Sequence, residues 1–177
     1  MPKPTAIRGL LAACTIAITG FASAADAPPV TAATLVDRAM IEDMLVQYYA
    51  RLGSDESDFS RWYTADGVID VNGLTGQGKA GIGNVYKQLA AMGGMQGGTF
   101  RMLLSNVLVS VNGATATADC IWTGLLSKQV TAKPEVVEQG REHDELVKQN
   151  GRWLFRNRVI TSDGGLEKEL VKSYKKR

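Results

Sequence analysis

The segment from Glu138 to Asp163 constrains the fold of this chain more than any other, because its pattern is typical of a β-hairpin. Two extended, partly apolar runs flank Gln149-Asn150-Gly151, and Asn-Gly between strand-like runs is a strong hairpin signal. The first run carries acidic residues and the only histidine of the chain, and the second carries aromatic residues beside arginines. The residues concerned are Glu142, His143, Asp144 and Glu145, followed by Trp153, Phe155, Arg156 and Arg158. The hairpin is therefore either a functional site or the charged edge of a sheet.

The side chains of the first run divide into two sets, since a strand turns successive residues to opposite faces. The sets are Gly140, Glu142 and Asp144 on one face, and Arg141, His143 and Glu145 on the other. If the first set faces the core, Glu142 is a carboxylate among aromatic rings, which suits general acid or base chemistry. Alternatively, Glu142 and Asp144 pair with Arg156 or Arg158 across the hairpin as a structural salt bridge. We expect His143 to face outward, toward solvent or a dimer interface.

The first 24 residues have the pattern of a cleavable signal peptide. Basic residues precede an apolar run, Gly9–Phe21, and small residues at Ala22-Ser23-Ala24 predict cleavage after Ala24. The apolar run is too short to span a membrane. We therefore expect a periplasmic or secreted protein with a mobile leader at 25–33. An alternative is a lipoprotein processing box ending at Cys14, but the apolar region before this cysteine is very short, which favours soluble export.

The composition argues against several kinds of partner and cofactor. The formal net charge is +2, and cleavage removes two basic residues, so nucleic acid is not expected as a partner. Cys120 is then the only cysteine and lies in an apolar run, which predicts a buried, unpaired thiol. A single histidine and scattered acids offer no metal-ligand cluster. The glycine-rich segments lack phosphate-loop spacing, and we predict no metal and no cofactor.

The order of the expected elements indicates one α+β domain. Apolar residues at helical spacing predict a helix from Thr34 to about Leu52, and two more are expected at 58–65 and 79–92. A single strand is expected at 67–74. Three further strand patterns, at 99–111, 114–128 and the hairpin, predict an antiparallel sheet with a turn at Asn112-Gly113. The domain spans 34–165, and a basic helix or tail follows at 166–177.

Four motifs in this order resemble the SnoaL-like branch of the nuclear transport factor 2-like superfamily over roughly residues 34 to 163. The motifs are Asp37-Arg38-x-x-Ile41-Glu42-Asp43, Trp62-Tyr63-Thr64-Ala65-Asp66-Gly67, Leu104-Ser105-Asn106-Val107 and Asn150-Gly151-Arg152-Trp153-x-Phe155. The resemblance implies a cone-shaped, curved antiparallel sheet wrapped around three helices and enclosing an apolar pocket. It also implies a homodimer formed through the outer face of the sheet.

The usual catalytic residues of this superfamily are absent from their positions in the chain. Dehydratase and dehydrohalogenase relatives use an Asp–His dyad, whose positions correspond here to Gly53 (or Leu52) and Met102. The carboxylate of the isomerase relatives corresponds to Val71, and the neighbouring Asp70 points to the other face of the strand. Tyr48 matches the helical tyrosine that donates a hydrogen bond to the developing oxyanion.

The resemblance therefore implies a cofactor-independent lyase or isomerase that acts on a small apolar aromatic, terpenoid, steroid or polyketide molecule. Glu142 or Asp144 would move the proton, and Tyr48 would stabilise the developing charge or simply belong to the core. The expected substrate-binding residues are Trp62, Phe100, Met102, Asn106 and Trp153. The alternative is a non-catalytic small-molecule-binding or protein-interaction domain, which the missing dyad favours.

Overall fold

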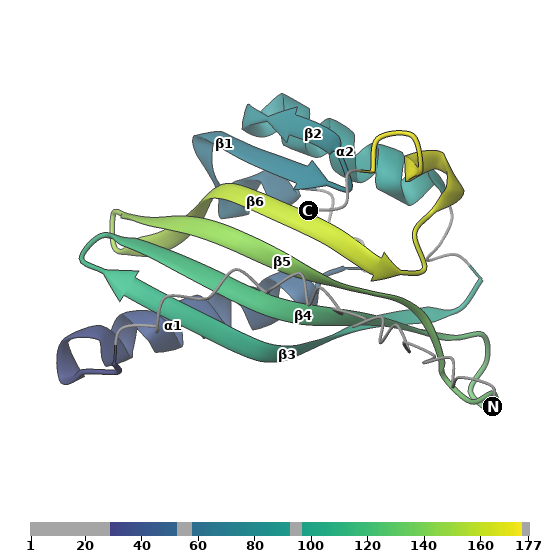
Figure 1. Cartoon of the computed structure of the whole chain (residues 1–177), viewed down its shortest axis with the longest axis horizontal. Helices are drawn as coiled ribbons and strands as arrows, with labels where there is room; N and C mark the ends of the chain where they lie inside the picture. The colour runs from purple at the N-terminus through teal and green to yellow at the C-terminus, as the bar shows by residue number, and fades with distance from the viewer. Residues whose placement is uncertain (1–28, 53–57, 93–96, 175–177) are drawn as a thin grey trace, which may run out of the picture.

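The computed structural model describes residues 29–52, 58–92 and 97–174. Helices and a single turn of 3-10 helix come first, and long strands follow, as Figure 1 shows. In chain order the elements are α1 (Ala32–Tyr49), η1 (Phe59–Trp62), β1 (Tyr63–Val71), β2 (Leu74–Gln77), α2 (Gly78–Met92), β3 (Thr99–Asn112), β4 (Thr115–Ser127), β5 (Glu135–Gln149), β6 (Arg152–Gly164) and η2 (Lys168–Leu170).

The strands form one curved sheet in the order β2-β1-β6-β5-β4-β3. Neighbours are antiparallel except β1 and β6, which run parallel. In Figure 1, α1 lies across one face of the sheet near β3, whereas α2 packs beside β1 and β2 at the opposite end. The predicted α+β class and the curved sheet are confirmed.

The predicted turns are correct, and the differences lie in short elements. The β5–β6 turn has Asn150 and Gly151 with φ of 50° and 77°, as an Asn-Gly hairpin requires. The second expected helix is only the 3-10 turn η1, so β1 begins at Tyr63 rather than at residue 67. The segment expected to be a loop after β1 contains the edge strand β2. A two-residue turn at Asn72-Gly73 joins β1 and β2 in a hairpin. The second strand contains few apolar residues, so its sequence does not indicate a strand.

The buried face of α1 follows the predicted helical spacing and holds Ile41, Leu45 and Tyr48 in the core. Polar contacts fix the start of the same helix. Asp37 Oδ1 accepts hydrogen bonds from Lys148 Nζ at 2.6 Å and from Trp153 Nε1 at 2.9 Å, and the side chain of Arg38 donates to a backbone carbonyl of β3. The Asp37-Arg38 motif therefore fastens α1 to the edge strand β3 and to the β5–β6 hairpin.

The signal peptide predicted at 1–24, Cys14 and most of the leader lie outside the described residues. The same holds for Gly53. Within the described ranges, no helix combines the length and the apolar character needed to cross a membrane.

Candidate functional site

A cavity of about 400 Å³ lies between the helices and the inner face of the sheet, and its wall is mainly apolar. The aromatic part of the wall comes from α1, η1, α2, β3 and β4. These residues are Tyr48, Tyr49, Phe59, Tyr86, Phe100 and Trp122. Since the contributing elements are spread along the whole domain, the cavity exists only in the folded chain.

The segment after β6 closes one end of this cavity. Gly165, Glu167 and Leu170 belong to the wall, and Leu170 is buried although it lies in a single helical turn. The hydroxyl of Tyr174 donates to the Ser162 carbonyl at 2.9 Å and attaches the segment to β6. The C-terminal residues thus contribute to the pocket and are not merely a solvated tail.

The positions that the resemblance assigns to catalytic bases lie at the cavity but carry apolar side chains. Leu52, Val71 and Met102 all form part of the wall. Gly53, the other position given for the aspartate of the dyad, lies outside the described residues. Any acid–base group must come from elsewhere in the wall.

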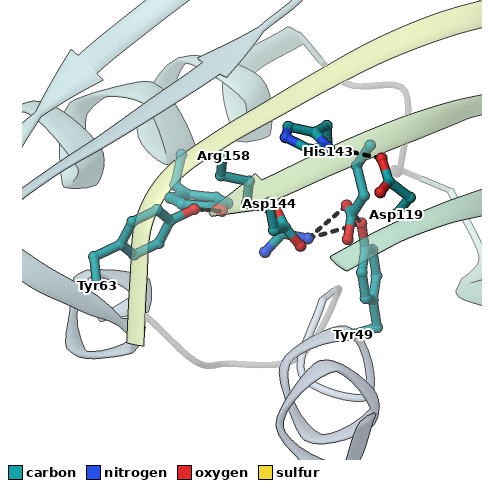
Figure 2. A network of polar contacts seen from close by, with 8 residues as sticks. Tyr49, Tyr63, Asp119, His143, Asp144 and Arg158 are labelled. Carbon is teal, nitrogen blue, oxygen red and sulfur yellow. Dashed lines mark hydrogen bonds and ion pairs between the residues drawn. The ribbon is translucent and has the colours of Figure 1, made fainter. Parts of the chain in front are cut away.

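Glu142 and Asp144 lie inside the fold in an ion-pair network with Arg158, and all three side chains are fully buried. Arg158 Nη2 lies 2.7 Å from Glu142 Oε2 and 2.8 Å from the Tyr49 hydroxyl. Tyr49 in turn donates to the same Glu142 oxygen, and Arg158 Nε lies 3.5 Å from Asp144 Oδ1. Figure 2 shows the tyrosine approaching the pair from α1.

Aromatic rings surround the guanidinium of Arg158. Its Cζ lies 4.0 Å from the ring centre of Tyr48, 4.5 Å from that of Phe155 and 5.1 Å from that of Tyr49. Cation–π attraction is strongest where water is excluded, as it is here. These rings therefore help to hold a buried positive charge that two acidic side chains only partly surround.

Burial and the neighbouring charges favour the neutral form of one carboxyl group of the network. Burial raises the pKa of Asp144 well above its usual 3.8, the charge of Glu142 raises it further, and Arg158 opposes both. Neither oxygen of Asp144 has a hydrogen-bond partner among the described residues. Arg158 and Glu142 form the closer ion pair, at 2.7 Å against 3.5 Å for Asp144, and burial together with the charge of Glu142 favours the neutral form of Asp144 beside it.

The ion pairs of the hairpin divide between the interior and the outer face of the sheet. Glu142 pairs with Arg158 across the hairpin, whereas Arg156 bonds to Glu145 on the outer face at 2.8 Å. Neither Glu142 nor Asp144 belongs to the cavity wall. The structure thus realises the salt-bridge alternative, but in the protein interior.

The predicted alternation along β5 is confirmed by the exposure of its side chains. Glu142 and Asp144 point inward, whereas His143 lies on the outer face with its Nδ1 2.7 Å from Asp119 Oδ1. Figure 2 shows this pair on the side of β5 opposite to Arg158.

Of the other predicted site residues, three lie in the cavity wall, two lie beside a smaller hollow and one is exposed. Phe100, Met102 and Tyr48 belong to the wall. Burial raises the pKa of Tyr48 to about 12 despite the opposing charge of Arg158. The side chains of Trp62 and Trp153 are buried beside a smaller hollow near α1. Asn106 is exposed, with φ of 53°, at a bulge of β3.

Sequence reasoning missed Glu138, the carboxylate of β5 that does face the cavity. Its side chain is half-buried, and burial raises its pKa to about 7, with a further contribution from the charge of Glu167. The period of two along β5 puts Glu138 on the same inner face as Glu142, so the sequence pattern could have identified Glu138 as a candidate. The contribution of Glu167 depends on the path of the chain after β6, which sequence periodicity does not predict.

The site has no cluster suited to a metal ion among the residues that the structure describes, where no three histidine, cysteine or acidic side chains converge. Cys120 is buried, and burial raises the pKa of its thiol, as do the charges of Glu142 and Asp144. A thiol in this state is a poor nucleophile. The polar side chains of the cavity wall are instead hydroxyl and carboxyl groups together with Asn72 and Lys87.

The curved, open sheet with its helices and inner cavity places the chain in the class of α+β proteins that is described as NTF2-like or cystatin-like. The SnoaL-like domain family matches residues 33–159, and the chain belongs to this family. No curated protein sequence matches the chain.

Several solved structures share the fold. ActVI-ORFA from Streptomyces coelicolor is 22% identical, with a TM-score of 0.62 over 71% of this chain and 97% of its own. A protein from Novosphingobium aromaticivorans that is named as a proposed scytalone dehydratase is 16% identical, with a TM-score of 0.61 over 81% and 91%. An NTF2-like protein of the same organism is 21% identical, with a TM-score of 0.62 over 78% and 91%. At these identities the likeness shows the fold alone.

Proposed function

We propose that the protein is a cofactor-independent lyase or isomerase that acts on a small, mainly apolar molecule. The observation that carries the proposal is an aromatic-walled cavity of about 400 Å³ that contains a carboxyl group with a pKa of about 7. A group with a pKa near the working pH both accepts and returns a proton efficiently. The likeness to a structure named as a proposed scytalone dehydratase supports the same class of reaction.

The test uses 2-tetralone, a bicyclic aromatic ketone with C–H bonds made acidic by the carbonyl group. We expect a rise in unfolding temperature that grows with ketone concentration, because a ligand that binds only the folded state stabilises it. We also expect the protein to accelerate incorporation of deuterium from D₂O into the ketone, measured by proton NMR. Absence of both effects would reject the proposed function.

A second candidate function is ligand binding without catalysis. It is favoured by the apolar side chains at Leu52, Val71 and Met102, where the resemblance places bases. For this function, 2-tetralone and the related phenol 2-naphthol should both stabilise the fold, while deuterium incorporation stays at the rate in buffer. The combination of binding and exchange separates the two functions.

Export and dimerisation belong to the same proposal. Mass spectrometry of the protein recovered from a periplasmic or culture fraction should give a chain that begins at Ala25. Sedimentation of the mature protein should give twice the mass of one chain if the outer face of the sheet forms a dimer. A full-length cytoplasmic chain or a monomer would contradict the corresponding statement.

A further inference from the structure

We propose that Glu138 is the proton-transferring residue of the cavity and that Glu167 tunes it. This inference rests on the proposed function and assigns it to particular side chains. It differs from the sequence-based assignment to Glu142, which lies outside the cavity wall in an ion pair with Arg158.

The backbone around Glu138 is shaped to direct its side chain into the cavity. The pairing of β5 with β4 shifts beside Gly124, the partner of Glu138, and the pairing with β6 shifts after Gln139. Bulges of this kind redirect side chains and are common next to active sites. Val137, the extra residue of the first bulge, and Glu138 both belong to the cavity wall.

Two glycines provide the space that this side chain occupies. A Cβ atom at Gly124 would lie 2.6 Å from Glu138 Cγ, and one at Gly165 would lie 2.6 Å from its Cα. Gly165 also has φ of 75°, which other residues rarely adopt. A longer side chain at either position would displace the carboxyl group from its place at the wall.

Few charged groups share the cavity with Glu138. Glu167 approaches from the segment after β6, and Lys87 lines the wall from α2. The strand opposite contributes Gly124, and α1 contributes the neutral phenols of Tyr48 and Tyr49. Burial first, and Glu167 second, raise the pKa of Glu138 to about 7, so its acid and base forms coexist near neutral pH.

Both reaction types proceed with Glu138 alone as the proton carrier. The carboxylate takes a proton from the carbon beside the carbonyl, and the C–H electron pair moves onto the carbonyl oxygen as an enolate. In an isomerisation, the new carboxylic acid returns the proton to a different carbon. In a dehydration, the enolate pair expels hydroxide from the next carbon, and the acid protonates it to water. Each route restores the carboxylate and needs no cofactor.

The test measures deuterium incorporation into 2-tetralone by four forms of the protein. We expect Glu138→Gln to lower the exchange rate by about 100-fold or more, as for a lost general base, while the stabilisation by 2-tetralone is retained. Glu138→Asp should recover part of the rate. The control Glu145→Gln, which removes an outer-face carboxylate paired with Arg156, should exchange at the wild-type rate.

The role of Glu167 has its own readout. Loss of its negative charge lowers the pKa of Glu138, so Glu167→Gln should move the pH midpoint of the exchange rate to lower pH without abolishing exchange. An unmoved midpoint would overturn the tuning role. If Glu138→Gln does not fold, the wild-type protein is titrated with pH while the glutamate carboxyl groups are followed by carbon-13 NMR. Midpoints that all lie near pH 4 would overturn the assignment.

The outcomes separate this inference from the proposed function. Exchange by the wild-type protein that persists in Glu138→Gln overturns the role of Glu138 and leaves the proposed function intact. A wild-type protein that neither binds 2-tetralone nor exchanges its protons overturns both. Binding without exchange supports the ligand-binding alternative and overturns the role of Glu138 in proton transfer.

Discussion

At the scale of single residues, the protein separates two kinds of buried carboxyl group by their surroundings. Glu142 and Asp144 lie in a fully buried ion-pair network with Arg158. Glu138 lies in the wall of an open space. The first kind determines how the hairpin and α1 fit together, and the second is available to a ligand.

The raised pKa of Asp144 predicts a particular dependence of stability on pH. Its pKa is raised in the folded state, so its stabilising contribution is fully present below the unfolded pKa and is lost as pH rises toward the folded pKa. Asp144→Asn cannot ionise. We expect the unfolding temperature of this variant, relative to wild type, to increase from pH 4 to pH 8 in thermal unfolding monitored by circular dichroism.

Glu142→Gln is the matched comparison, because it leaves the charge of Arg158 buried without its partner. Breaking a buried pair in this way destabilises a protein by about 3–5 kcal/mol. Urea unfolding at pH 7 should therefore rank Glu142→Gln well below Asp144→Asn in free energy of unfolding. Equal stability of the two variants would contradict the assignment of the ion pair.

At the scale of elements, α1 is held to the sheet by polar contacts at its start as well as by its apolar stripe. Asp37→Ala removes the acceptor of Trp153 Nε1, and a buried donor left without a partner costs about 1–3 kcal/mol. Lys148→Met removes only the charged partner and should have the smaller effect. Urea unfolding of both variants tests this order, and a larger effect of Lys148→Met would contradict it.

A substitution at Gly140 tests how tightly β5 packs against its neighbouring strands. A Cβ atom there would lie 2.2 Å from the Thr161 carbonyl oxygen and 2.4 Å from Trp122 Cζ2, whereas one at Gly164 would meet nothing within 4 Å. We expect Gly140→Ala to destabilise the fold by about 1–3 kcal/mol through overpacking. Gly164→Ala, the control, should unfold at nearly the wild-type denaturant concentration.

At the scale of the whole molecule, the cavity depends on the two ends of the domain meeting. Leu52, after α1, and Leu170, after β6, belong to the same wall. A ligand in this cavity would therefore contact most of the fold at once.

Truncation after Gly164 tests this dependence. The shortened chain loses Leu170 from the wall and the bond from Tyr174 to Ser162, but keeps the sheet and both α-helices. We expect the far-ultraviolet circular dichroism of a folded domain, a lower unfolding temperature, and loss of the stabilisation by 2-tetralone. Full stabilisation by the ketone after truncation would show that the C-terminal segment is not needed for binding.

Much of the fold could be predicted from the sequence because its signals are local. The Asn150-Gly151 turn sets the register of the hairpin, and the period of two along β5 placed Glu142 inside and His143 outside. The short edge strand β2 gives a much weaker signal, since only one of its four residues, Leu74, is apolar. It forms because the Asn72-Gly73 turn brings it against β1.

The candidate site was predictable only in part, because its chemistry depends on contacts between distant segments. The sequence alone determined most of the order of the elements and the inner face of β5, since these follow from local periodicity, and the resemblance to a family indicated that the usual bases are replaced. Only the tertiary structure decided that Glu142 pairs with Arg158 and that Glu138 meets Glu167 at a cavity. Burial and charge interactions depend on distances in space, and residues far apart along the chain acquire those distances only when it folds.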